Sequence, residues 1–261
     1  MNSALWVSKT GLQAQDTALR TISNNLANVG TTGFKKDRVV FEDLMYQINQ
    51  QPGGQSTQDS TLPSGTQLGT GVRVAGTQKQ FTVGSLQPTE RSLDLAIEGN
   101  GFFQIALPDG SIGYTRTGSF SVNQDGQLVT AQGYSMEPAL NVPQDTVSLT
   151  IGRDGTVSAL SGGQTAPAQI GNIQLSSFIN PAGLEAVGSN LYRETVASGA
   201  PQQTTPGQNG TGEILQGVLE ASNVSVVEEM VNMVSTQRAY EMNARVVTTA
   251  DQMLQYLAQN V

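Results

Sequence analysis

Carboxylates are the side chains that could carry out acid–base catalysis in this 261-residue sequence, because it contains neither His nor Cys. The acidic residues that lie close together along the chain are Glu42 with Asp43, Asp94 with Glu98, and Glu228 with Glu229. Two carboxylates about 5–10 Å apart could hydrolyse a glycosidic bond. A sugar site also needs aromatic platforms, however, and only 5% of the residues are aromatic. We therefore expect these carboxylates to be solvated or to cap helices, and we predict no catalytic residues.

The composition argues against most other chemical sites. Without His or Cys, the chain can form neither a Ser-His-Asp triad nor a Cys nucleophile, and it lacks the usual zinc and redox-metal ligands. The segment 123–126 has part of the pattern of a calcium loop but lacks its distal Glu, so a turn is expected there. No Gly-rich phosphate-binding motif occurs. We predict no cofactor and no metal.

Charge and hydropathy limit the partners. The net charge of −8 argues against nucleic acid, since phosphates require clustered Lys and Arg. The one basic cluster, Lys35, Lys36 and Arg38, is expected to stabilise a helix C-terminus or to meet an acidic neighbour. No window contains the roughly 18 apolar residues of a membrane span, so we predict no membrane insertion. The N-terminal residues show no cleavable signal peptide.

The first segment of the chain is expected to be a helix. Ser3 is a candidate N-cap, and residues 28–30 (Asn-Val-Gly) form a stop signal. Leucines recur every seven residues, with small residues beside them, and Ile22 extends the row. This spacing is typical of a coiled-coil seam. The residues of the seam are Leu5, Leu12, Leu19, Ile22 and Leu26.

The last segment has the same spacing. Ser225 and Glu228 form a capping-box pattern, and a helix over residues 225–259 would be about 50 Å long. Its start is apolar on all sides, which favours burial by several neighbours. The packing residues are expected to be Val226, Met230, Met233, Tyr240, Val247 and Leu254.

The first helix cannot bury enough surface alone. Four leucines contribute about 8 kcal/mol on burial, whereas ordering each residue costs about 1–2 kcal/mol. Two ordinary amphipathic helices packed on a core are the alternative interpretation. We favour ends that pair with each other and with neighbouring subunits, and that fold on assembly.

The middle of the chain is expected to be β-structure. The dipeptides Asp109-Gly110, Asp125-Gly126 and Asp154-Gly155 are hairpin turns flanked by apolar or alternating runs. Residues 102–105, 119–122, 147–151 and 170–175 are predicted strands. The predicted class is therefore α+β, with a terminal helical domain (1–34 and 221–261), an extended or β connector (35–95 and 198–220) and a β-rich outer domain (96–197).

Several motifs along the chain form a characteristic set. Asn24, Asn25, Leu26, Ala27 and Asn28, followed by Gly33 and Phe34, resemble the N-terminal signature of bacterial flagellar rod and hook proteins. Residues 95–103, 114–120, 228–233, 237–241 and 249–254 are similar to the family's centre and C-terminal end. Segment 47–68 resembles a stretch that distinguishes stiff rods from bendable hooks. Its marker residues are Gln51, Pro52, Gly53, Leu62, Pro63, Ser64 and Gly65.

The resemblance implies a structural subunit of the rod that polymerises into a straight hollow tube, transmits torque to the hook and contains the export channel. It implies export by the flagellar type III apparatus and assembly in the periplasm of the basal body. The implied partners are other copies of the chain, proximal rod proteins, the hook protein, peptidoglycan and outer-membrane ring proteins, the rod cap and the export apparatus. The alternatives are a proximal rod or hook-type subunit, a carboxylate-dependent peptidoglycan hydrolase, and a surface adhesin.

Overall fold

The computed structural model describes residues 3–51, 53, 55–57, 60–61, 64–164 and 166–259. The chain divides into two compact units. The helical unit contains Met1–Ala27, Asp37–Gln78 and Ser225–Val261, and the β unit contains Asn28–Lys36 and Lys79–Val224. The helices at the two ends of the chain and the mostly β middle region confirm the predicted fold class. The finer three-part division into domains stays a prediction.

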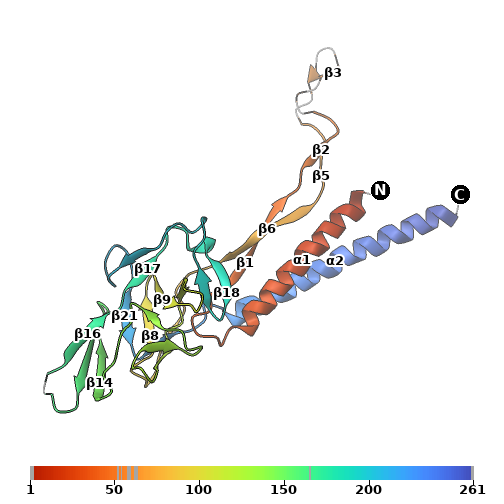
Figure 1. The fold of residues 1–261 in the computed structure, drawn as a ribbon. Coiled ribbons are helices and arrows are strands. Elements are labelled where there is room, and N and C mark those ends of the chain that lie inside the picture. Colours follow the sequence, from red (N-terminus) through yellow and green to blue (C-terminus); the bar gives the residue numbers. More distant parts are fainter. Residues whose placement is uncertain are drawn as a thin grey trace. The chain divides into compact units, whose positions relative to one another are not determined.

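The helical unit is built on two antiparallel helices, α1 (Ser3–Ala27) and α2 (Val226–Gln259). They lie side by side, and the marked chain termini are at the same end of the pair (Figure 1). The end of α1 agrees with the stop signal at residues 28–30, and α2 begins directly after Ser225. Both predicted helices are therefore confirmed.

The most buried row of α1 is not the leucine row. Its five buried residues are mostly small or polar, namely Ser8, Ala14, Ala18, Ile22 and Asn25. The four leucines at spacing seven are only half-buried. At Gly11, an added Cβ would lie 3.0 Å from Asn243 Nδ2 of α2, so the helices approach closely there. Because Gly11 has no side chain, the Asn243 side chain can lie directly against the backbone of α1.

A two-stranded ribbon completes the helical unit. Strand β1 (Asp37–Asp43) is paired with β6 (Val72–Lys79), and β2 (Tyr46–Ile48) with β5 (Gln67–Gly69). Farther along, β3 (Gln55–Thr57) is paired with β4 (Ser60–Thr61). Of the segment expected to mark stiff rods, Gln51, Gly53, Ser64 and Gly65 lie between these strands, whereas Pro52, Leu62 and Pro63 lie outside the described residues.

The β unit contains one larger sheet and several small ones. The larger sheet has seven strands in the order β18-β19-β10-β9-β17-β20, with β13 also paired to β9. Its strands are β9 (Phe102–Ala106), β10 (Ile112–Thr115), β13 (Met136–Glu137), β17 (Leu175–Ser177), β18 (Glu185–Gly188), β19 (Leu191–Arg193) and β20 (Gln202–Thr204). A 3-10 helix, η1 (Pro181–Gly183), connects β17 to β18.

The remaining strands of this unit form short antiparallel pairs and one three-stranded sheet, β14-β15-β16. The pairs are β11 with β12, β21 with β8, and β22 with β7. The bounds are β7 (Leu86–Pro88), β8 (Leu95–Glu98), β11 (Phe120–Val122), β12 (Leu128–Thr130), β14 (Thr146–Ile151), β15 (Thr156–Ser161), β16 (Ala168–Asn172), β21 (Glu213–Gln216) and β22 (Val218–Glu220).

All three Asp-Gly hairpins are confirmed, joining β9 to β10, β11 to β12, and β14 to β15. The single strand predicted over 170–175 was wrong, because the chain divides there into β16 and β17. Between them, the backbone N–H of buried Ile173 donates to Gly155 O at 2.8 Å as the chain passes from the small sheet to the larger one. An apolar run alone does not reveal such a change of sheet.

Candidate functional site

The carboxylates that are close together in sequence have separate structural contacts. Glu42 forms an exposed ion pair with Arg73 at 2.8 Å. Asp94 is buried and accepts a hydrogen bond from Thr89 Oγ1 at 2.8 Å, whereas its expected companion Glu98 is exposed. Glu229 is also buried, and it accepts from Asn25. These contacts stabilise the fold.

The described residues provide neither a metal-ligand cluster nor a membrane-spanning helix. No group of three or more acidic, His or Cys side chains is placed so that it could hold a metal ion within that part of the chain. No helix of the described segments has the length and apolar character needed to cross a membrane.

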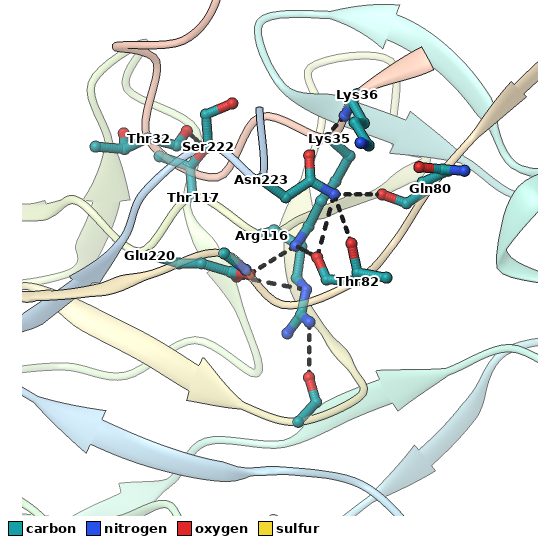
Figure 2. A network of polar contacts seen from close by, with 12 residues as sticks. Thr32, Lys35, Lys36, Gln80, Thr82, Arg116, Thr117, Glu220, Ser222 and Asn223 are labelled. Carbon is teal, nitrogen blue, oxygen red and sulfur yellow. Dashed lines mark hydrogen bonds and ion pairs between the residues drawn. The ribbon is translucent and has the colours of Figure 1, made fainter. Parts of the chain in front are cut away.

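A buried ionic cluster is the main polar feature of the β unit (Figure 2). Lys35 Nζ lies 2.6 Å from Glu220 Oε1, and the two side chains are 0% and 1% exposed. The same ammonium group donates to Thr82 O at 2.7 Å. Lys35 belongs to the basic cluster of the sequence. Its contact with Glu220 confirms the acidic neighbour that we expect for this cluster.

Arg116 is the second cation of the cluster. Its Nη2 donates to Gly99 O at 2.6 Å, its Nε lies 3.6 Å from Glu220 Oε2, and its guanidinium lies over the ring of Phe102. Burial, then the nearby Arg116 charge, lowers the pKa of Lys35. We name Lys35, Arg116 and Glu220 the ionic triad. Two cations share one carboxylate, so a formal charge of +1 is buried there.

The triad also joins two stretches that are far apart in the sequence, and both lead to the helices. Gly33 N donates to Glu220 O at 2.8 Å, and Lys36 N donates to Asn223 Oδ1 at 2.8 Å. Asn223 Nδ2 in turn donates to Gln80 O at 2.8 Å. Gly33 has φ +70°, and a Cβ there would lie 2.8 Å from Thr117 N, so no other residue fits without a shift. Segments 28–36 and 220–224 are thereby held together.

The helical unit has its own polar contact between distant residues. Asn25 Oδ1 accepts from Asp37 N at 2.9 Å, while its Nδ2 donates to Asp37 O at 2.9 Å and to Glu229 Oε2 at 3.3 Å. The remaining residues of the N-terminal signature differ in burial. Asn24 and Ala27 are exposed, Leu26 and Asn28 half-buried, and Gly33 and Phe34 buried.

The expected packing residues lie at different levels of exposure in the single chain. Ile22 is buried, whereas Leu5, Leu12, Leu19 and Leu26 are half-buried. On α2, Met233 and Val247 are half-buried, and Val226, Met230, Tyr240 and Leu254 are exposed. A groove with a volume of about 580 Å³ runs along this helix. It is lined by Met230, Val231, Val234, Ser235, Arg238, Ala239 and Met242.

Sequence reasoning missed Arg116 and Glu220. Arg116 stands in a stretch used only for its overall resemblance, and Glu220 ends the short strand β22 with no acidic neighbour in sequence. A signal was present, since a single charge beside an apolar run such as Val218-Leu219 is a candidate for a buried ion pair. The partner of such a charge is not apparent from spacing.

The ionic triad and the contact of Asn25 with Glu229 join segments that are far apart in the sequence, and these contacts are structural. Three family models match the chain: "Flagella basal body rod protein" over residues 5–35, "Flagellar hook protein FlgE/F/G D1 domain" over 96–159 and "Flagellar basal body rod FlgEFG protein C-terminal" over 215–260. The chain belongs to this family of flagellar rod and hook proteins.

The chain is similar along its whole length to proteins named flagellar basal-body rod protein FlgG. The protein of Buchnera aphidicola subsp. Schizaphis graminum is 57% identical, covering 99% of this chain and all of the relative. The protein of Borreliella burgdorferi is 47% identical over 97% of both chains, and that of Caulobacter vibrioides 45% identical over 98% of both. The chain is accordingly a structural subunit of the flagellar distal rod.

Proposed function

We propose that copies of this chain polymerise through α1 and α2 into a straight, rigid, hollow tube that transmits motor torque to the hook and contains the export channel. The observation that carries this proposal is the exposed apolar surface at the start of α2. Its members there are Val226, Val227, Met230, Val231 and Val234.

The free energy available from covering this surface is large. Full burial of one exposed side chain of this kind contributes about 1.5–3 kcal/mol. Because the five are 40–73% exposed, together they offer about 4–8 kcal/mol to an assembling subunit. A contiguous apolar surface of this kind is a typical contact region between proteins. Within the helical unit α1 covers only one side of α2, whose start remains exposed elsewhere. Further copies of the chain are the partners that we propose for those sides.

The half-buried leucine row of α1 has the same role in the proposal. Leu5, Leu12 and Leu19 are partly covered within the helical unit and retain surface for a neighbouring helix.

The remaining proposals rest on the resemblance alone. They are assembly in the periplasm after type III export without a cleaved signal, and contacts with proximal rod proteins, the hook protein, the peptidoglycan and outer-membrane rings and the rod cap.

Assembly of purified full-length protein tests the proposal. Leu19→Glu and Val247→Asp place a charge in the proposed contacts and should abolish straight filaments in electron micrographs, because burying a carboxylate without a partner is costly. Gln13→Glu and Thr248→Asp are matched controls on exposed positions of the same helices. Circular dichroism of the β unit's strands should be unchanged in all four variants. Normal filaments from Leu19→Glu and Val247→Asp would contradict the proposed contacts.

Hydrogen exchange supplies a second test. We expect amides of α1 and α2 to exchange quickly in the isolated subunit and slowly in the polymer, since helices whose apolar sides lack neighbours open readily. Complete protection of both helices in a stable monomer would contradict folding on assembly. Curved filaments would favour a hook-type subunit instead of a rod.

A further inference from the structure

A cavity of about 330 Å³ in the β unit has a cation in its wall. Aromatic rings supply much of the lining, and Arg116 of the ionic triad is the one charged residue among the lining residues. Polar groups also line it, from Asn100 and Asn209. Such a mixture of apolar walls and a few polar groups is typical of a binding site.

The guanidinium of Arg116 is not fully satisfied. Its side chain is 2% exposed, and its buried Nη1 has no hydrogen-bond partner among the described residues. The one carboxylate of the triad serves two cations: Glu220 Oε2 lies 3.6 Å from Arg116 Nε, while its Oε1 binds Lys35 Nζ at 2.6 Å and accepts from Gly84 N at 2.9 Å. Two buried cations with a single counter-charge are costly. A carboxylate that enters the cavity would balance the formal +1 charge of the triad.

The rim of the cavity is apolar and prominent. Ile179, which lines the cavity, is 82% exposed. A second loop with the fully exposed Val196 lies beside it, because Asn180 Nδ2 donates to Ala197 O at 3.0 Å. Large apolar side chains exposed next to a cationic cavity favour a protein ligand that presents a carboxylate together with an apolar side chain.

Such a ligand is present on the surface of the same β unit. Asp145 is exposed, and Val147, two residues later, is 74% exposed. The pairing of β14 with β15 shifts its register between Thr146 and Ser148, so Val147 is the extra residue of a β-bulge. Bulges redirect a side chain away from the sheet. The hairpin of β14 and β15 thus has an exposed carboxylate and, two residues later, an exposed apolar side chain.

We infer that the Arg116 cavity of one subunit binds the carboxylate of Asp145 from a second copy of this chain, with Val147 against the rim at Ile179. This inference rests on the proposed function, because it requires the polymer. It adds a charge contact between β units to the apolar contacts between helices. The net charge of −8 makes such a contact valuable, since the subunits otherwise repel one another.

The experiment is a charge exchange across the contact. Ile179→Asp places a competing carboxylate at the rim, and Val187→Asp, at another exposed apolar position of the β unit, is its matched control. We expect Ile179→Asp and Asp145→Asn each to raise the critical concentration for polymerisation about tenfold, a change of about 1.4 kcal/mol. Val187→Asp should leave it unchanged. Combining Ile179→Asp with Asp145→Lys should restore most of the loss.

Each outcome decides the inference. If Ile179→Asp polymerises like Val187→Asp, the cavity is not a contact and the inference is wrong. If Ile179→Asp is impaired while Asp145→Asn polymerises normally, a different carboxylate enters and the assignment of Asp145 is wrong. Titration of the ¹⁵N-labelled subunit with sodium acetate should shift the Arg116 side-chain signals, and no shift would contradict a carboxylate site. Polymerisation of the wild-type chain tests the proposed function separately.

Discussion

Asn25 and Glu229 are 204 residues apart in sequence, yet Asn25 Nδ2 donates to Glu229 Oε2 at 3.3 Å across the antiparallel helices. The close approach of Gly11 and Asn243 fits the same register, because each step toward the start of α1 is matched by an equal step along α2. Two rows of residues at a spacing of seven therefore face each other. The row on α1 is Ala4, Gly11, Ala18 and Asn25, and the opposite residues on α2, in the same order, are Ala250, Asn243, Thr236 and Glu229. The pair is therefore specified by small and polar residues.

Replacing Asn25 tests this register directly. Asn25→Ala leaves Glu229 and the backbone of Asp37 without their partner, and each unsatisfied buried group costs about 1–3 kcal/mol. We expect the free energy of unfolding of the helical unit to fall by about 2–4 kcal/mol, measured by urea titration of helical circular dichroism in the polymer, where both helices are expected to be protected. Ser23→Ala, on an exposed position of the same helix, should change it little. Equal stability of the two variants would show that the contact does not fix the register.

Gly11 tests the close approach of the helices. Gly11→Leu must push against Asn243 and should destabilise the pair by about 1–3 kcal/mol despite the better helix propensity of Leu. Because the obstacle is a side chain, Asn243→Ala should recover part of the loss in the double variant. Gln13→Leu adds the same side chain at an exposed position and serves as the control. Thermal unfolding measures all four proteins, and a stable Gly11→Leu would contradict the close approach.

The ionic triad predicts an order of effects. Glu220→Gln leaves two buried cations without a carboxylate and should cost about 3–5 kcal/mol. Lys35→Met should cost less, because Arg116 still has Glu220 as its partner. The double variant that combines Glu220→Gln with Lys35→Met should lose less unfolding free energy than the two single losses added together, as is usual for residues in one network. Urea unfolding of the β unit gives these values, and a Lys35→Met variant less stable than Glu220→Gln would reverse the charge argument.

Tyr114 predicts a loss of stability at alkaline pH. Burial, together with its contact to Glu194, raises the pKa of Tyr114 to about 12. The unfolded chain, with a pKa near 10 for this residue, therefore loses the proton first, and stability present below pH 10 is lost as the pH rises toward 12. The shift corresponds to about 2–3 kcal/mol.

Comparison with Tyr114→Phe isolates this contribution. The variant lacks the hydroxyl. The difference in unfolding free energy between it and the wild type should therefore change by about 2–3 kcal/mol between pH 9 and pH 12. Urea unfolding at fixed pH values provides the measurement. A difference that is constant with pH would mean that Tyr114 does not titrate in this range.

The sequence predicted the elements whose signals are local. The two helices follow from their spacing and stop signals, and the three hairpins from Asp-Gly, since that dipeptide adopts the turn by itself. Which helix row would be buried did not follow. Within one chain the leucines are half-buried, whereas the buried residues of α1 are Ser8, Ala14, Ala18, Ile22 and Asn25, because backbone approach depends on the partner helix. Ile22 belongs to the predicted packing residues, and the leucine seam stays a prediction for the assembled subunits. Likewise, the sequence places Lys35 in a basic cluster, whereas its neighbours Glu220 and Arg116 in the triad follow only from the fold.

The division of the helical unit into three separate stretches of sequence has a kinetic consequence. Residues 28–36 and 79–224 build the β unit, whose long stretch is continuous, whereas α1 cannot meet α2 until Ser225–Val261 is present. The pairing of α1 with α2 closes a loop that contains the whole chain between Ala27 and Val226. Closing such a long loop is slow, and contacts between distant residues form late. A chain that emerges gradually from either end can thus complete its β unit before its helices pair. The timing of helix pairing then depends on the arrival of whichever end emerges last.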